Sequence, residues 1–162
     1  PGDVGTEPTI TDDCATAQTP ALVAVSGGYR SAWFDNDGTM GFQVVTRLLG
    51  ADGAPSGGAQ RITMGDGIIH DAPYLAAGPS GVVAAFVEDD IMGSRTGQTM
   101  LLNASGAGAA AATTIAATSL QEMRLVPLPM GVGALFVRPM ADEQHVFFQP
   151  LDADGRVAGA LE

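Results

Sequence analysis

Alternating apolar runs and glycine turns between residues 20 and 63 predict four short strands. The expected strands are 22–26, 29–35, 42–49 and a last short one at Ile62. The expected turns contain Gly27-Gly28, Asn36-Asp37-Gly38 and Ala51-Asp52-Gly53. Glycine after Asp or Asn accepts the positive φ that tight hairpin turns require. The segment therefore predicts a four-stranded antiparallel meander.

The same pattern recurs twice further along the chain. Trp33 is matched by Phe86 and Phe136, and the turn residue Gly53 is matched by Gly106 and Gly155. The second copy predicts strands at 74–78, 82–88, 98–103 and 113–116, and the third at 122–128, 133–139 and 146–151. Such self-similarity at a near-constant spacing is the signature of a repeat architecture.

The alanine-rich stretch 107–117 has two interpretations. Alanine favours a helix by intrinsic propensity. However, Ile115 follows Gly106 by the same nine residues that separate Ile62 from Gly53. This register predicts a loop followed by a strand, and we prefer it.

The third copy lacks its last strand, because position 164 would match Ile62 and the sequence ends at Glu162. Thr9-Ile10-Thr11 is similar to Arg61-Ile62-Thr63, so residues 9–12 are expected to complete the third unit. Such pairing would hide exposed strand edges. We therefore expect a flexible lead at 1–8 and one domain at 9–162, with units at 20–63, 73–116 and 123–162.

Composition limits the partners and the location. The net charge is −11, and all seven cationic residues are arginine, so a basic surface for nucleic acid or anionic membranes is not expected. No apolar run is long enough for a membrane span. The chain starts at Pro1 without Met, and its Pro/Gly/Thr-rich opening is typical of a tether after a removed leader. This favours an extracytoplasmic (secreted, periplasmic or outer-surface) location. Cys14 is alone and is expected to be a free thiol or a buried small residue.

The repeated positions supply the first candidate site residues. Trp33, Phe86 and Phe136 are either packing residues between sheets or a ligand platform, and packing is the preferred interpretation. Asp35 and Glu88 are equivalent and could form a pair of catalytic carboxylates. Because Arg138 occupies the third equivalent position, a structural role is preferred.

Other motifs are weaker. Asp35-Asn36-Asp37-Gly38 and Asp152-Ala153-Asp154-Gly155 resemble the start of a calcium loop, but a glutamate at the twelfth position is absent, so hairpin turns are preferred. The remaining candidates lack metal spacing or phosphate-loop context: His70-Asp71, His145, Ser26-Gly27-Gly28 and Gly106-Ala107-Gly108. We expect no catalytic residues, no metal and no cofactor, and ligand-binding residues are not identified.

The run from Trp33-Phe34-Asp35 through Arg47-Leu48-Leu49-Gly50 to Arg61-Ile62-Thr63 resembles bacterial extracytoplasmic β-propeller repeats, such as those of myxobacteria. The resemblance covers residues 9–162. It implies an all-β fold of four-stranded antiparallel blades, three per chain, with six in a head-to-tail homodimer or with a second half-propeller. A β-trefoil is the alternative fold.

Three functions remain open. The first is a non-catalytic, secreted or cell-surface module that binds protein or glycan. The second is a structural or assembly half-propeller. The third, which is least favoured, is a glycan-active hydrolase that uses Asp35 and Glu88.

Overall fold

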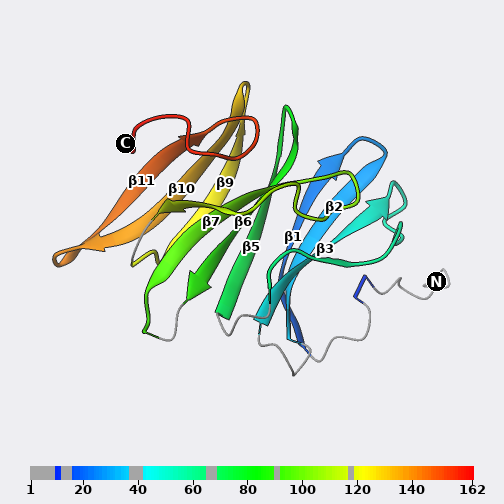
Figure 1. Ribbon diagram of the computed structural model, residues 1–162, viewed down its shortest axis with the longest axis horizontal. Helices are drawn as coiled ribbons and strands as arrows, with labels where there is room; N and C mark the ends of the chain where they lie inside the picture. Colours follow the sequence, from blue (N-terminus) through cyan, green and yellow to red (C-terminus); the bar gives the residue numbers. More distant parts are fainter. Residues whose placement is uncertain (1–9, 12–15, 37–41, 65–68, 90–91, 117–118) are drawn as a thin grey trace, which may run out of the picture.

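The computed structural model is all-β, with three antiparallel sheets arranged side by side (Figure 1). It describes residues 10–11, 16–36, 42–64, 69–89, 92–116 and 119–162. These residues form eleven strands and no helix. None of the described segments is therefore a helix of the length and apolarity that crossing a membrane requires.

Each sheet follows the order of its strands along the chain. The first sheet contains β1 (Thr16–Val25), β2 (Gly28–Asn36), β3 (Phe42–Gly50) and β4 (Gln60–Arg61). The second contains β5 (Ile69–Gly78), β6 (Gly81–Asp89), β7 (Arg95–Leu102) and β8 (Thr113–Ala116). The third contains β9 (Glu122–Leu128), β10 (Gly131–Met140) and β11 (Glu143–Leu151).

All strands predicted within the three units are present, but β1 and β5 begin at Thr16 and Ile69, earlier than the predicted 22 and 74, and β4 ends at Arg61, before Ile62. The alanine-rich stretch forms a loop followed by β8 at Thr113–Ala116, as its register with Ile62 predicted. Helix propensity is overridden there because Thr113 and Thr114 pair with Thr99 and Gln98 of β7. The prediction that the third unit has one strand fewer is also confirmed within the described residues.

The core lies between neighbouring sheets, because β6 is buried on both faces. Val82, Ala84 and Phe86 pack toward the first sheet, in one cluster with Val44 and Ile62. The alternate residues of β6 pack toward the third sheet: Val83, Ala85 and Val87, in one cluster with Ile115, Leu120, Met123 and Phe136. Successive strand residues point to opposite faces, so one strand serves both clusters.

One hydrogen bond repeats at both sheet–sheet boundaries. The Thr46 hydroxyl of β3 donates to the Gly106 carbonyl at 2.7 Å, from the first sheet to the turn after β7. The Thr99 hydroxyl of β7 donates to the Gly155 carbonyl at 2.6 Å, from the second sheet to the turn after β11. The two boundaries are therefore built alike, as expected for stacked repeats.

The N-terminal segment does not complete the third sheet within this chain. The carbonyl oxygen of Ile10 accepts a hydrogen bond from Arg47 Nη1 at 2.8 Å, so Ile10 lies against the first sheet. Thr11 lies there as well, beside Trp33. The expected pairing of residues 9–12 with β11 of the same chain is therefore wrong for Ile10 and Thr11, while residues 9 and 12 lie outside the described part. The hydrogen bond from Arg47 to the Ile10 carbonyl holds this segment at the first sheet, at the opposite end of the stack from β11.

The outer edge of β11 is occupied at one position by Glu162. Phe148 N–H donates to the Glu162 carbonyl at 2.9 Å, and Glu162 N–H donates to the Phe148 carbonyl at 3.0 Å. Glu162 lies fourteen residues after Phe148, as Gln60 and Thr113 do after their partners Thr46 and Thr99. Glu162 thus takes the first position of a fourth strand, and no described residue pairs with this edge at Val146.

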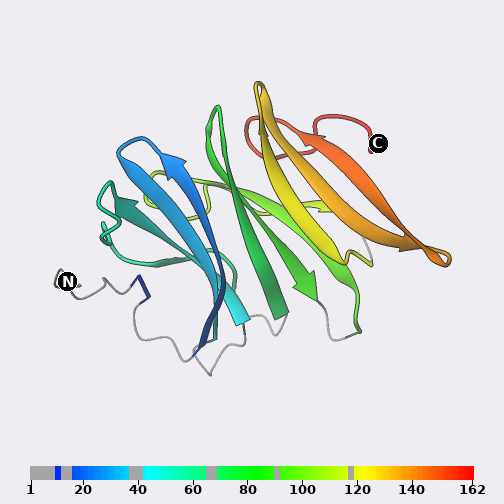
Figure 2. The same ribbon diagram turned by 180° about the vertical axis from the view of Figure 1, so that it is seen from behind.

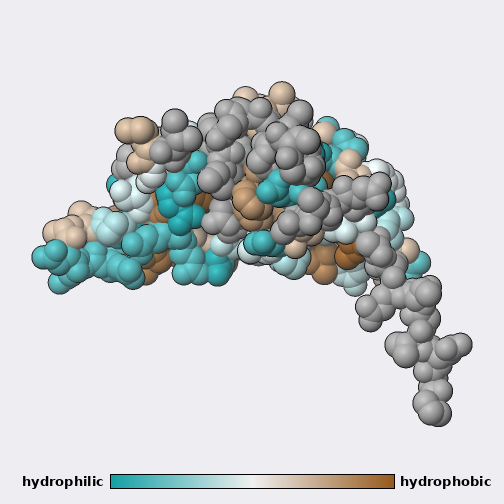
Figure 3. All heavy atoms as spheres, turned by 90° about the horizontal axis from the view of Figure 1, so that it is seen from below, coloured by the Kyte–Doolittle hydropathy of each residue, from teal (hydrophilic) through white to brown (hydrophobic). Residues whose placement is uncertain are grey.

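The first strands of the three sheets lie next to one another. Figure 2 shows β1 in blue, β5 in green and β9 in yellow as neighbours, and contacts join β1 to β5 and β5 to β9. The outer strands β4 and β8, with two and four residues, are shorter than the inner strands. In the view from below, hydrophilic residues cover much of the left end of the molecule (Figure 3).

Candidate functional site

A groove lies where the inner strands of all three sheets meet. It has a volume of about 400 Å³, and we call it the inner-strand groove. Its lining comes from β1, β5 and β9: Thr19, Pro20, Ala21, Leu22, Pro73, Tyr74, Leu75, Arg124 and Leu125. This volume lies within the range typical of small-molecule sites.

Two matching irregularities shape the wall of the groove. The register of β1 with β2 shifts between Gln18 and Ala21, and that of β5 with β6 shifts between Asp71 and Tyr74. A proline lies inside each shift, at Pro20 and Pro73. Proline cannot donate a ladder hydrogen bond, so it is accommodated where pairing is interrupted. Thr19 additionally adopts a φ of 47°.

Tyr74 and Arg124 form the polar part of the groove. Arg124 Nη1 donates to the Tyr74 hydroxyl at 2.6 Å, and the guanidinium carbon lies 4.7 Å from the centre of the Tyr74 ring. Arg124 is also held by the Met123 carbonyl at 2.7 Å and by Glu122 at 2.6 Å. These contacts orient a cation and an aromatic ring together.

Leu22 of β1 also lines the groove and is 59% exposed. An aromatic ring, a fixed guanidinium and an apolar side chain can bind a ligand that carries both polar and apolar groups.

The sequence pointed to the repeated aromatic residues, and the structure gives them a packing role. Phe86 and Phe136 are each 1% exposed and pack toward the preceding sheet. Trp33 is 4% exposed and lies on the face of the first sheet that points away from the second. Packing between neighbouring sheets is therefore confirmed for Phe86 and Phe136. Trp33 is buried as well, but it belongs to neither of the two core clusters.

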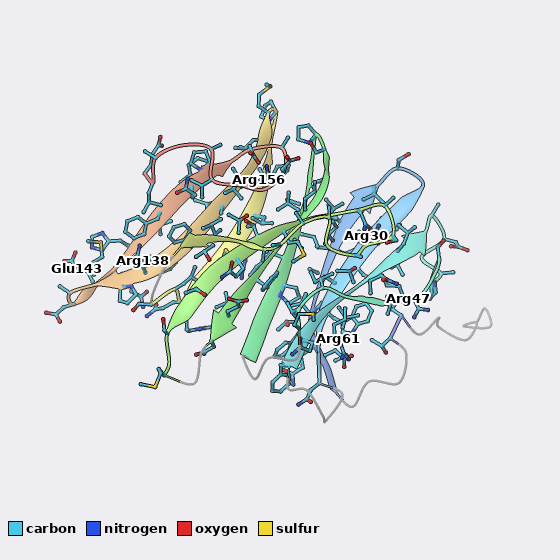
Figure 4. The ribbon with its side chains drawn as sticks, in the orientation of Figure 1. Arg30, Arg47, Arg61, Arg138, Glu143 and Arg156 are labelled. Atoms are coloured by element: carbon cyan, nitrogen blue, oxygen red, sulfur yellow. The ribbon has the colours of Figure 1, made fainter. Side chains whose placement is uncertain are left out.

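The carboxylate pair falls in separate sheets. Asp35 is buried near the end of β2, whereas Glu88 lies near the end of β6 and accepts a hydrogen bond from Gln98 Nε2 at 2.8 Å. The third equivalent residue, Arg138, lies over the ring of Phe147, with its guanidinium carbon 5.6 Å from the centroid (Figure 4). The Glu88 carboxylate is thus hydrogen-bonded to a side chain of its own sheet, and Asp35 belongs to a different sheet.

The Asp152–Gly155 motif is a turn. Asp152 Oδ1 accepts the N–H groups of Asp154 and Arg156 at 2.9 Å, and Gly155 has a φ of 79°. In the other Asp-Gly motif, Asp35 and Asn36 belong to β2, and residues 37 and 38 lie outside the described part, as does Cys14.

The remaining motifs form no metal site among the described residues. His145 lies 3.5 Å from Glu143 through Nε2, and the backbones of His70 and Asp71 belong to β5. No group of three or more His, Cys, Asp or Glu side chains gathers in the described segments. Gly27 lies in the turn between β1 and β2, and Gly28 begins β2. Gly106 and Ala107 lie in the loop after β7, and Gly108 forms a β-bridge with Leu102.

The sequence did not identify Tyr74 and Arg124. Ala21, Tyr74 and Arg124 occupy equivalent positions in the three units. Each pairs with the residue that directly precedes the repeated aromatic residue: Ala32, Ala85 and Leu135, respectively. The signal was a repeat position at which the residue type changes from small to aromatic to cationic. Packing rarely requires such a change, whereas binding can.

Comparison with known proteins identifies no relative. No protein-family model, no curated protein and no solved structure matches the chain.

Proposed function

We propose that this chain is a non-catalytic β-propeller module that binds protein or glycan in the inner-strand groove, in an extracytoplasmic location. The observation that carries the proposal is the Tyr74–Arg124 pair, which lies in a groove of about 400 Å³ that exposed Leu22 also lines. Each sheet takes its strands from one repeat, which favours blades over the alternative β-trefoil.

A glycan and peptide array with purified protein tests the binding function. We expect Tyr74→Ala to reduce binding at least about ten-fold, because truncating a central aromatic contact typically costs 1–2 kcal/mol or more. Tyr29→Ala is the matched control, because Tyr29 is also half-buried and lies outside the groove. Binding that survives in Tyr74→Ala, or a protein that binds nothing on the array, would contradict the proposal.

The second candidate is assembly, in which two chains stack head to tail into a six-bladed ring. It is favoured by the two outer sheet faces, which no described sheet covers. On the outer face of the third sheet, Leu135 and Val137 alternate with the core residues Ala134 and Phe136. Phe148 and Val146 pair with Leu135 and Val137 and share this face. Gly106 and Gly155 pack against Arg30 and Val83 of the preceding sheet. The equivalent Gly53, in the turn of the first sheet, has no atom of a described residue other than its chain neighbours within 4 Å of the position that a Cβ would take, so this turn is free to pack against a second copy.

The position of Ile10 fits this arrangement. Arg47 pairs with Ser31, and Ser31 shares a face with Trp33, so Arg47 holds Ile10 at the outer face of the first sheet. In a head-to-tail ring this face meets the third sheet of the second copy. Residues 9–12 of one chain would then reach the unpaired edge of β11 in the other. Sedimentation at twice the chain mass of 16.4 kDa is the expected result, and a folded monomer would exclude the ring.

A further inference from the structure

A second pocket lies between the first and second sheets, away from the inner-strand groove. It has a volume of about 440 Å³ and is called here the inter-sheet pocket. Its walls are mostly aliphatic, from Val25, Leu48, Val82, Leu101 and Leu102. Its polar lining consists of Ser26, Ser80, Asn103 and Arg30.

Arg30 is an unusual residue for this position. It is only 4% exposed, and Nη2 donates to the carbonyl of Ala104, another lining residue, at 2.8 Å. Its Nε and Nη1 are buried without a hydrogen-bond partner, and no carboxylate of the described residues forms an ion pair with it. Figure 4 shows Arg30 beside the loop that follows β7.

A buried guanidinium without an anion is costly. Loss of hydration disfavours the charged form unless an opposite charge replaces the water. Accordingly, burial lowers the pKa of Arg30 below its ordinary value. A negatively charged group in the pocket, next to Nη2, would compensate this charge.

The repeat shows that the fold does not need an arginine here. Arg30 pairs with Leu48, and in the second unit Val83 pairs with Leu101 at the equivalent place. Val83 packs against Gly155 as Arg30 packs against Gly106. An aliphatic residue therefore fills the same position at the next sheet–sheet boundary, without a charge.

We propose that the inter-sheet pocket binds a small organic monocarboxylate, with its carboxylate at Arg30 and its apolar body against the aliphatic walls. Arg30 is the only cationic residue among the described residues that line the pocket, so it matches a ligand with one negative charge. The leucine and valine side chains match an apolar ligand body. The walls come from two sheets, so a bound ligand would also join them.

The experiment uses 4-phenylbutyrate as the probe, its neutral analogue 4-phenylbutyramide, and sulfate as an anion without an apolar body. Calorimetry should give the tightest binding for 4-phenylbutyrate, with the amide weaker by at least about ten-fold, because the amide lacks the charge-assisted hydrogen bond to the guanidinium. Amide NMR shifts in the wild-type protein should change at Ser80, Asn103 and Ala104. Arg30→Met, which keeps the side-chain length, should lower the affinity for 4-phenylbutyrate at least about ten-fold.

Arg156→Met is the matched control, because it removes the same charge from an exposed side chain outside the pocket. It should leave the affinity unchanged. Equal affinity for acid and amide, equal affinity for sulfate, no binding of the acid, or NMR shifts that map elsewhere would each overturn the proposal. The NMR mapping uses only the wild-type chain, so it decides the matter even if Arg30→Met fails to fold.

Discussion

At the scale of single residues, two hydroxyl groups connect the sheets. Thr46 and Thr99 are completely or almost completely buried, and each donates to the carbonyl of a turn glycine in the next unit. Gly106 and Gly155 both have positive φ, which directs the turn toward the threonine of the neighbouring sheet. The side chain thus satisfies a buried carbonyl that the strand ladder does not.

Replacing Thr99 by valine should destabilise the protein by about 1–3 kcal/mol, because a buried carbonyl acceptor loses its donor while the shape is kept. Thr113→Val is the control on the paired strand, since the Thr113 hydroxyl makes no hydrogen bond within the described residues. Urea denaturation of both variants measures the difference. Equal stabilities would mean that the Thr99 bond contributes nothing.

At the scale of elements, the start of the second strand in a unit is sterically restricted. A Cβ on Gly28 would collide with the backbone carbonyl of Leu49, and one on Gly131 with that of Leu151. Gly28 pairs with Gly50 at the end of β3, and Gly131 precedes Val132, which pairs with Leu151 at the end of β11. Glycine therefore allows the second and third strands of a unit to stay in contact to their ends.

Gly131→Ala should lower the free energy of unfolding by about 1–3 kcal/mol, because the collision is with backbone that cannot rotate away. Gly58→Ala is the control: its nearest neighbour would be Gln60 Nε2 at 4.0 Å. We expect that variant to stay within about 0.5 kcal/mol of the wild type. Thermal unfolding checks both, and a stable Gly131→Ala protein would contradict the steric argument.

At the scale of the whole molecule, the stack of sheets leaves two unlike ends. One end presents the outer face of the first sheet, with Trp33 and Ile10. The other presents the outer face of the third sheet, where Val146 is 70% and Leu135 is 38% exposed. At this end Phe148 takes the place of Thr46 and Thr99, and its ring lies over Gly133. The two sheet–sheet boundaries within the chain each contain a threonine hydroxyl that donates a hydrogen bond to a turn carbonyl. A boundary between the third sheet and a second copy would have the apolar ring of Phe148 at that position.

A charge on this face should prevent assembly. In Leu135→Glu, ring formation would bury a carboxylate without a partner, which disfavours association by several kcal/mol. Met130→Glu is the control, because Met130 lies in the turn between β9 and β10 and is 85% exposed. Sedimentation should give a monomer for Leu135→Glu and a dimer for the control. A dimer that persists in Leu135→Glu would place the interface elsewhere.

The sequence by itself determined the strands, their order and their repetition. Apolar runs and Asp-Gly or Gly-Gly turns act between residues close in the chain, so 29–35 and 42–49 could be paired by inspection. The register of Ile115 with Ile62 was sufficient to choose a strand over a helix for the alanine-rich stretch. The short third unit followed from the same register.

Only the tertiary structure decided where side chains from different units meet. Tyr74 and Arg124 are fifty residues apart, and the packing of β5 against β9 brings them into one groove. Ile10 resembled a closing strand by its sequence, yet Arg47 holds it at the other end of the stack. Arg30 and Ala104 became neighbours through sheet packing alone. Local patterns encode hairpins, because their hydrogen bonds join nearby residues, whereas the contacts between sheets depend on packing over the whole chain.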